Sequence, residues 1–153
     1  MLIPGTVVVL VPRLIAEREG ASVSDAPLVR TAGALLIVAG CSIMTRCIWD
    51  FARKGRGTLA PVDPPRSLVV HGLYRHVRNP MYLGALMALV GQAVLLESKA
   101  ISVYTILWLI WVHLFVVLYE EPALKRQFGN SYEEYCTAVH RWTPVGTSRR
   151  GRG

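Results

Sequence analysis

The sequence has few cysteines and lacks the spaced clusters that mark metal sites or disulfide frameworks. Its three cysteines, Cys41, Cys47 and Cys136, show no paired spacing, so we expect them to be small apolar packing residues. No pair of His, Cys or carboxylate residues has metal-ligand spacing, and we predict no metal. The dinucleotide-binding signature is also absent, because Gly-Arg-Gly at 55–57 neither follows a predicted strand nor opens a helix.

Charged residues are missing from three long stretches, which argues against an ordinary soluble domain. Residues 31–45, 80–96 and 100–119 contain no Asp, Glu, Lys or Arg, and a bilayer core requires roughly 20 apolar residues of helix. A fourth apolar segment opens the chain, interrupted by Pro4 and Pro12, and it lacks the basic start and the cleavage site of a signal peptide. We predict an all-α integral membrane protein with about four transmembrane helices.

The predicted organisation is one membrane domain at 1–147 and a disordered basic tail at 148–153. The apolar runs predict transmembrane helices at about 1–16, 31–51, 80–97 and 100–121, and a cytoplasmic amphipathic helix at about 131–140. Prolines in the second loop forbid a long helix, and its β-branched end at 67–70 is expected to be extended. Small residues along the third helix allow close packing, within the monomer or between subunits: Gly84, Ala88 and Gly91.

Acidic residues are outnumbered, with 10 Asp and Glu against 17 Lys and Arg and a formal net charge of +7. The basic residues concentrate at 53–78 and 125–152 rather than in the other two connections. The positive-inside rule then predicts a cytoplasmic second loop, a cytoplasmic C-terminus and a cytoplasmic N-terminus. The excess reflects topology and attraction to anionic headgroups, so we predict a membrane partner and no nucleic acid.

The stretch HGLYRHVRNPMYLG at 71–84 places polar chemistry at the edge of an apolar run. Asn79 is a favourable N-cap and Pro80 suits the first helical position, so the third helix is predicted to begin there. The free N–H groups of that helix N-terminus favour an anion. Arg75, Arg78 and two tyrosines surround the same point, either as a cofactor or substrate site or as an interfacial belt.

A second polar segment, EEPALKRQFGNSYEEYCTAVHRWTP, follows the last apolar run at 120–144. Pro122 disfavours helix at Glu121, and a bend there is predicted to direct Glu120 and Glu121 into one cytoplasmic pocket. The alternative is a helix boundary with salt bridges to Lys125 or Arg126. Farther on, Ser131 and Glu134 are predicted to form a capping box, and one helix face to carry Tyr132, Tyr135 and Val139, a stripe more typical of packing than of chemistry.

Together the two segments resemble the isoprenylcysteine carboxyl methyltransferase family, which belongs with the phosphatidylethanolamine and phospholipid N-methyltransferases. The resemblance covers roughly residues 55–145 and rests on an Arg-Asn-Pro-x-Tyr-x-Gly element, a glutamate pair and a Phe-Gly-x-x-Tyr-x-x-Tyr element. It implies a multi-helix membrane enzyme that uses S-adenosylmethionine and releases S-adenosylhomocysteine. It also implies the residues that bind the cofactor: Ser67, Leu68, Val69, Tyr74, Asn79, Pro80, Met81, Tyr82 and Glu120.

Two positions depart from the family pattern. The carboxyl methyltransferases usually have His before the proline, where this chain has Asn79, which can hydrogen-bond but does not titrate. The eukaryotic members carry an arginine one turn before the glutamates, where this chain has Val116. The resemblance therefore implies methyl transfer to a lipid or lipophilic acceptor from the bilayer without naming prenylcysteine.

The acceptor atom is left open between a carboxylate and an amine. A carboxylate acceptor needs a cation to orient it, for which Arg78 and Arg141 are candidates. An amine acceptor needs a base, for which Glu121, His71 and His113 are candidates. His113 lies about two turns before the glutamates. The alternative to a catalytic role is that His113 is a polar core residue whose ring hydrogen-bonds to a neighbouring helix. Two other functions stay open: a nicotinamide-dependent reductase of the wider superfamily, and a non-catalytic membrane protein.

Overall fold

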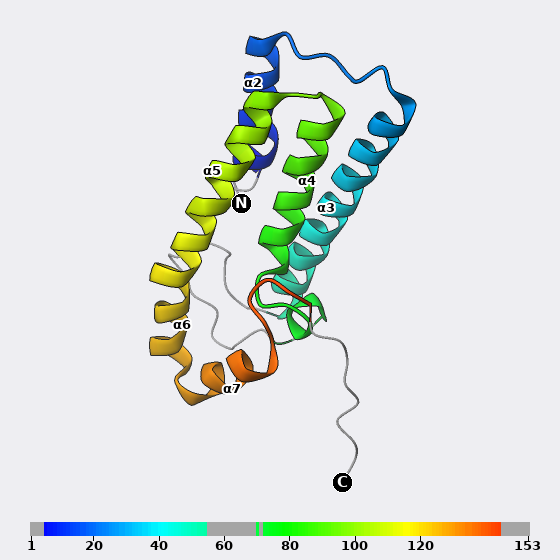
Figure 1. The fold of residues 1–153 in the computed structure, drawn as a ribbon. Coiled ribbons are helices and arrows are strands. Elements are labelled where there is room, and N and C mark those ends of the chain that lie inside the picture. Colours follow the sequence, from blue (N-terminus) through cyan, green and yellow to red (C-terminus); the bar gives the residue numbers. More distant parts are fainter. Residues whose placement is uncertain (1–4, 55–69, 71, 145–153) are drawn as a thin grey trace.

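The computed structural model describes residues 5–54, 70 and 72–144, and these residues form helices and no strand. Four helical rods lie side by side, and a short helix crosses one end of them (Figure 1). The first rod joins the π-helical turn η1 (Thr6–Leu10) to α2 (Val11–Glu19). The second is α3 (Pro27–Lys54) and the third is α4 (Pro80–Leu95). The expected extended segment at 67–70 lies outside the described residues, except for Val70.

The fourth rod corrects the predicted end of the last apolar helix. It joins α5 (Lys99–Phe115), the π-helical turn η3 (Val116–Glu120) and α6 (Glu121–Phe128), so helical backbone continues past Glu121 to Phe128. Pro122 is tolerated because it falls in the first turn of α6, where its missing N–H is not needed. The extra residue of a π turn rotates the side chains that follow it, which matters for the two glutamates.

The connection to α7 (Asn130–Ala138) corrects the predicted capping box. Gly129 has φ +51° and ψ −128°, a backbone conformation that glycine adopts most easily, and the chain turns sharply there. The N-cap position of α7 consequently falls on Gly129, which has no side chain to cap the helix, and Ser131 already lies in the first turn. The other described element of this end is the 3₁₀ turn η2 (Gly72–Arg75), just before α4.

Glycines bring α3 and α4 into close contact, as the small residues of α4 predict. A side-chain carbon at Gly40 would lie 2.4 Å from the carbonyl oxygen of Gly84, and one at Gly91 would lie 2.8 Å from that of Gly33. Larger residues at these two crossings would force the helices apart. The seam fixes the end of α3 relative to the start of α4.

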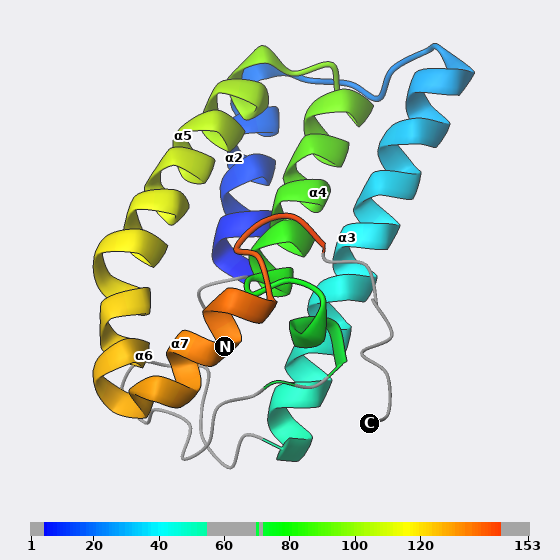
Figure 2. The same cartoon turned by 60° about the horizontal axis from the view of Figure 1, so that its bottom comes forward.

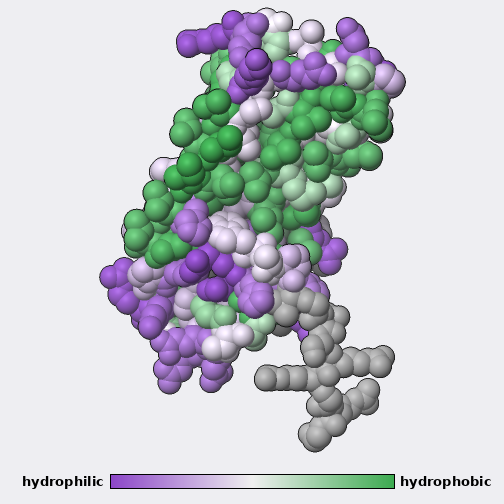
Figure 3. Space-filling view, in the orientation of Figure 1, coloured by the Kyte–Doolittle hydropathy of each residue, from purple (hydrophilic) through white to green (hydrophobic). Residues whose placement is uncertain are grey.

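The surface of the rods is apolar between two polar ends (Figure 3). Two described helices are long and apolar enough to cross a membrane, Pro27–Asp50 and Lys99–Phe128, whereas α4 is shorter. Within their most apolar windows only 17% and 28% of the residues are buried. A core helix of a soluble protein would be mostly buried, so these helices expose apolar faces of the kind that lipid covers.

Candidate functional site

The end of α3, the start of α4 and the junction of α6 with α7 lie at the same end of the rods (Figure 2). Hydrogen bonds between polar side chains link the start of α4 to the fourth rod there. The segment that follows α7 folds back over this end: the Arg78 N–H donates to the carbonyl oxygen of His140 at 2.9 Å. We call residues 140–142 the strap. It brings the C-terminal part of the chain against the start of α4.

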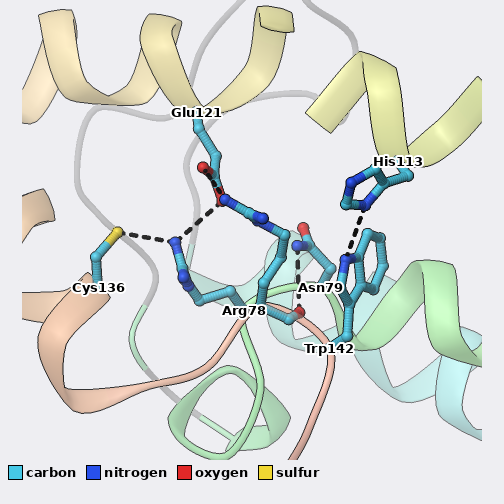
Figure 4. A network of polar contacts seen from close by, with 7 residues as sticks. Arg78, Asn79, His113, Glu121, Cys136 and Trp142 are labelled. Carbon is cyan, nitrogen blue, oxygen red and sulfur yellow. Dashed lines mark hydrogen bonds and ion pairs between the residues drawn. The ribbon is translucent and has the colours of Figure 1, made fainter. Parts of the chain in front are cut away.

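Glu121 is the centre of an ion-pair cluster (Figure 4). Arg141 donates from Nε to Oε1 and from Nη2 to Oε2, both at 2.7 Å, which is bidentate pairing. Arg78 donates from Nη1 to Oε1 at 3.0 Å and also to Sγ of Cys136 at 3.0 Å. The side chains are 19% exposed for Glu121, 15% for Arg78 and 31% for Arg141. Two guanidinium groups share one carboxylate, so the cluster has a net charge of +1.

The same cluster settles how the two glutamates are paired within the described residues. Lys125 pairs with Glu133 at 2.7 Å, and Glu121 pairs with Arg78 and Arg141, so the ion pairs of the described residues do not include the salt bridge to Lys125 or Arg126 that the alternative interpretation required. Hydrogen bonding to Glu121 raises the pKa of Arg141, which stays charged.

Asn79 precedes α4 but does not cap it with its side chain, contrary to expectation. The buried amide instead donates to the Arg141 carbonyl oxygen at 3.4 Å, because the strap lies beside it. Pro80 occupies the first turn of α4 as predicted and is fully buried. The N–H groups of the first turn therefore have no side-chain cap, and they can receive an anionic group.

Glu120 faces different partners from its neighbour. Its Oε2 accepts a hydrogen bond from the Tyr82 hydroxyl at 3.1 Å. Tyr74 interacts electrostatically with Glu120, with Tyr82 and with Cys47 of α3. Burial, followed by these neighbours, raises the pKa of the Tyr74 hydroxyl, which therefore stays protonated. Glu120, Tyr74 and Tyr82, far apart in the sequence, thus form one group.

The predicted aromatic stripe of α7 is buried beneath this group. Tyr132, Tyr135 and Val139 form a hydrophobic cluster with Val70 and other apolar neighbours. The Tyr135 hydroxyl donates to the Tyr74 carbonyl oxygen at 2.7 Å, which ties α7 to η2. The stripe therefore contributes to the site by packing α7 against the elements that carry the site residues.

His113 projects from α5 toward the strap (Figure 4). Trp142 Nε1 donates to His113 Nδ1 at 3.2 Å, so Nδ1 acts as the acceptor in this contact. The two rings lie 6.1 Å apart between centroids. Sequence reasoning did not single out Trp142, since a lone tryptophan near a membrane surface is ordinary.

A surface cavity of about 410 Å³ opens beside the Glu121 cluster. It lies between α6 and α7, and its wall consists of Arg78, Val117, Glu121, Pro122, Lys125, Tyr132, Glu133 and Cys136. The volume is in the range of small-molecule sites. It therefore has room for part of a small molecule next to Arg78.

The remaining predicted residues divide into those that the structure describes and those that it does not. Met81 is half-buried in the first turn of α4, and Val116, at the position of the family arginine, is fully buried in η3. Ser67, Leu68, Val69 and His71 lie outside the described residues. Across the described residues no group of three or more His, Cys, Asp or Glu could hold a metal ion. Sequence reasoning missed Asp50 of α3, whose side chain lies against Gly72 of η2. The sequence pattern that could have identified it is the one that identified the glutamates, an acidic residue at the end of an apolar helix.

Comparisons with known proteins identify the family. Residues 28–131 match the family described as Phospholipid methyltransferase. A "Probable protein-S-isoprenylcysteine O-methyltransferase" of Oryza sativa subsp. indica is 37% identical over 84 residues, which cover 54% of this chain and 43% of the rice protein. "Protein-S-isoprenylcysteine O-methyltransferase A" of Arabidopsis thaliana is 35% identical over 80 residues, 51% of this chain and 40% of that protein.

The matched segments thus span less than half the length of these curated relatives. No solved structure is significantly similar to this chain. The match to the family extends from the start of α3 to the start of α7 and includes Arg78, Glu120 and Glu121. The chain belongs to the phospholipid methyltransferase family.

Proposed function

We propose that this protein transfers a methyl group from S-adenosylmethionine to a lipid or lipophilic small molecule at the cytoplasmic face of a membrane. The observation that carries the proposal is the position of the site. Glu120, Tyr82 and the Glu121 cluster lie at the polar end of an apolar set of rods. Leu118 and Tyr119, which directly precede the two glutamates, are exposed apolar side chains. A water-soluble donor and a membrane-embedded acceptor can meet there.

The exposed apolar surface of the rods supports a protein that crosses the membrane several times. Besides the two long helices, α4 is apolar, and Val8 of the first rod packs with Ala85 and Ala88 of α4. Basic residues gather at the end of the molecule that carries the site, which corresponds to the cytoplasmic side under the positive-inside rule. We therefore propose four membrane-embedded rods with the site facing the cytoplasm.

The residues of the site fit S-adenosylmethionine. Glu120 offers a carboxylate that Tyr82 holds in place at 3.1 Å, suited to ribose hydroxyl groups or an amino group. The uncapped first turn of α4 offers N–H donors to the carboxylate of the cofactor. Tyr74 stays neutral and can hydrogen-bond without adding charge. When bound, the cofactor supplies an electrophilic methyl group on a positively charged sulfur.

The chain mainly has to align the acceptor with that methyl group. The net positive Glu121 cluster suits an acceptor with a carboxylate or phosphate, and Arg78 lines the adjacent cavity. Glu121 is a poor base because two guanidinium groups hold both of its oxygens, so we assign it the positioning of Arg78 and Arg141. For an amine acceptor, the candidate base is His113, whose Nδ1 accepts a hydrogen bond from Trp142.

The test is calorimetric binding of S-adenosylhomocysteine to the detergent-purified protein. Glu120→Ala and Tyr82→Phe should weaken binding by roughly tenfold or more, because each removes a contact to the cofactor or its support. Tyr104→Phe is the matched control. The Tyr104 hydroxyl of α5 donates to the Val7 carbonyl oxygen of η1, and this hydrogen bond lies away from the site. Radiolabelled methyl transfer into lipid extracts then identifies the acceptor class.

Three outcomes decide the proposal. Micromolar binding that both site variants lose and Tyr104→Phe keeps supports the methyltransferase. Equal losses in all three variants point to general destabilisation and contradict the site assignment. Absence of binding to folded wild-type protein contradicts the proposal itself and directs attention to nicotinamide cofactors or a non-catalytic role.

A further inference from the structure

Asp50 is a carboxylate without a good partner near the end of α3. Its side chain is 16% exposed, and Oδ2 is buried with no hydrogen-bond partner among the described residues. Arg46, the nearest cation, lies 3.7 Å away, which is beyond hydrogen-bond length, and its side chain is 68% exposed. Such a pair is screened by solvent and contributes little.

The position of Asp50 makes this arrangement unfavourable on three grounds. A negative charge near a helix C-terminus opposes the helix dipole. An ionisable group at the end of an apolar, span-length helix is costly to place. A buried carboxylate oxygen that accepts no hydrogen bond from the described residues has lost hydration without replacement there. A ligand that provides a cation at this point would remove all three costs.

Asp50 faces the candidate cofactor site. Its carboxylate lies directly against Gly72 of η2, where an added side-chain carbon would be 2.2 Å from Oδ2. Cys47, one turn earlier on the same face of α3, is fully buried and interacts with Tyr74. Tyr74 in turn interacts with Glu120. Two carboxylates, Asp50 and Glu120, therefore flank the turn that carries Tyr74, and neither has a strong cation partner in the described part of the chain.

We propose that Asp50 binds the α-amino group of S-adenosylmethionine. The ionised carboxylate would accept hydrogen bonds from the ammonium group, which is the one cation of the cofactor with N–H donors. The sulfonium has no such donor, and ribose hydroxyl groups are neutral and would leave the buried charge unbalanced. This assignment rests on the proposed function, since it names a further residue of the same cofactor site.

The experiment compares two ligands on each protein variant. S-adenosylhomocysteine and its analogue with hydrogen in place of the α-amino group are titrated calorimetrically into the full-length, detergent-purified chain. Asp50→Asn removes the charge and keeps the shape, whereas Asp50→Glu keeps the charge. Asp25→Asn is the matched control, because Asp25 is exposed and precedes the opposite end of α3. The readout is the ratio of the two affinities, which cancels any unfolded fraction of a sample.

The wild type, Asp50→Glu and Asp25→Asn should prefer S-adenosylhomocysteine by about tenfold or more, and Asp50→Asn should reduce that preference to about twofold or less. A preference that survives in Asp50→Asn would overturn the assignment. So would an equal loss of both ligands, which would show that Asp50 only supports η2. Failure of the wild type to bind S-adenosylhomocysteine would instead overturn the proposed function, and the two failures are therefore distinguishable.

Discussion

Replacing Glu121 with glutamine tests whether the ion-pair cluster holds the site together. Glutamine keeps one acceptor oxygen and turns the other into an NH₂ donor. Arg141 donates to both oxygens at 2.7 Å, so one of its bonds becomes a contact between two donors. Arg78 and Arg141 also lose the charge between them. A hydrogen bond to a charged group contributes about 1.5–3 kcal/mol.

The side chains of the cluster are 15–31% exposed, so solvent screens part of that contribution. We expect Glu121→Gln to lower the free energy of unfolding by about 2 kcal/mol. The assay is reversible unfolding in mixed detergent micelles, followed by tryptophan fluorescence. Glu133→Gln is the matched control, because Glu133 pairs with Lys125 at the same 2.7 Å but both side chains are more than half exposed. Similar losses in the two variants would refute the reasoning that burial gives the Glu121 cluster its strength.

Three further predictions use the same unfolding assay. Gly40→Ala should destabilise the protein by about 1–3 kcal/mol, because its methyl group would lie 2.4 Å from a carbonyl oxygen of the facing helix, whereas Gly5→Ala, with nothing within 4 Å, should not. A stable Gly40→Ala protein would contradict the close packing. Burial raises the pKa of the Tyr74 hydroxyl in the folded protein, so its contribution to stability should be fully present below about pH 10 and should fall at higher pH. Tyr74→Phe should reduce this loss of stability at alkaline pH. An unchanged loss in Tyr74→Phe would show that other groups cause it. Trp142→Phe removes the donor to His113 and should lower the free energy of unfolding by about 0.5–1 kcal/mol, the net contribution of one hydrogen bond; an unchanged stability would show that the bond is absent in solution.

The helical rods could be predicted from the sequence because long apolar runs have few other solutions. The end of the fourth rod could not be predicted in this way. The bend predicted at Pro122 rested on the steric rule for the residue before a proline. The π turn Val116–Glu120 places Pro122 in a first helical turn, and nothing in the local sequence signals that turn.

The site residues were individually visible in the sequence, but their pairing was not. Glu120 and Glu121 are adjacent and chemically alike, yet one accepts from Tyr82 and the other binds two arginines. The partners of Glu121 are 43 and 20 residues away in sequence, so only the three-dimensional fold brings them together. Asp50 was missed because its neighbour in space, Gly72, is also distant in sequence.

The strap sets the order in which the candidate site can be completed during synthesis. Its three residues supply a carbonyl oxygen to Arg78, a guanidinium to Glu121 and an indole N–H to His113. These residues leave the ribosome after all of the described rods. A growing chain can therefore form its rods before the candidate site is assembled, and the site is complete only when the strap packs against the start of α4.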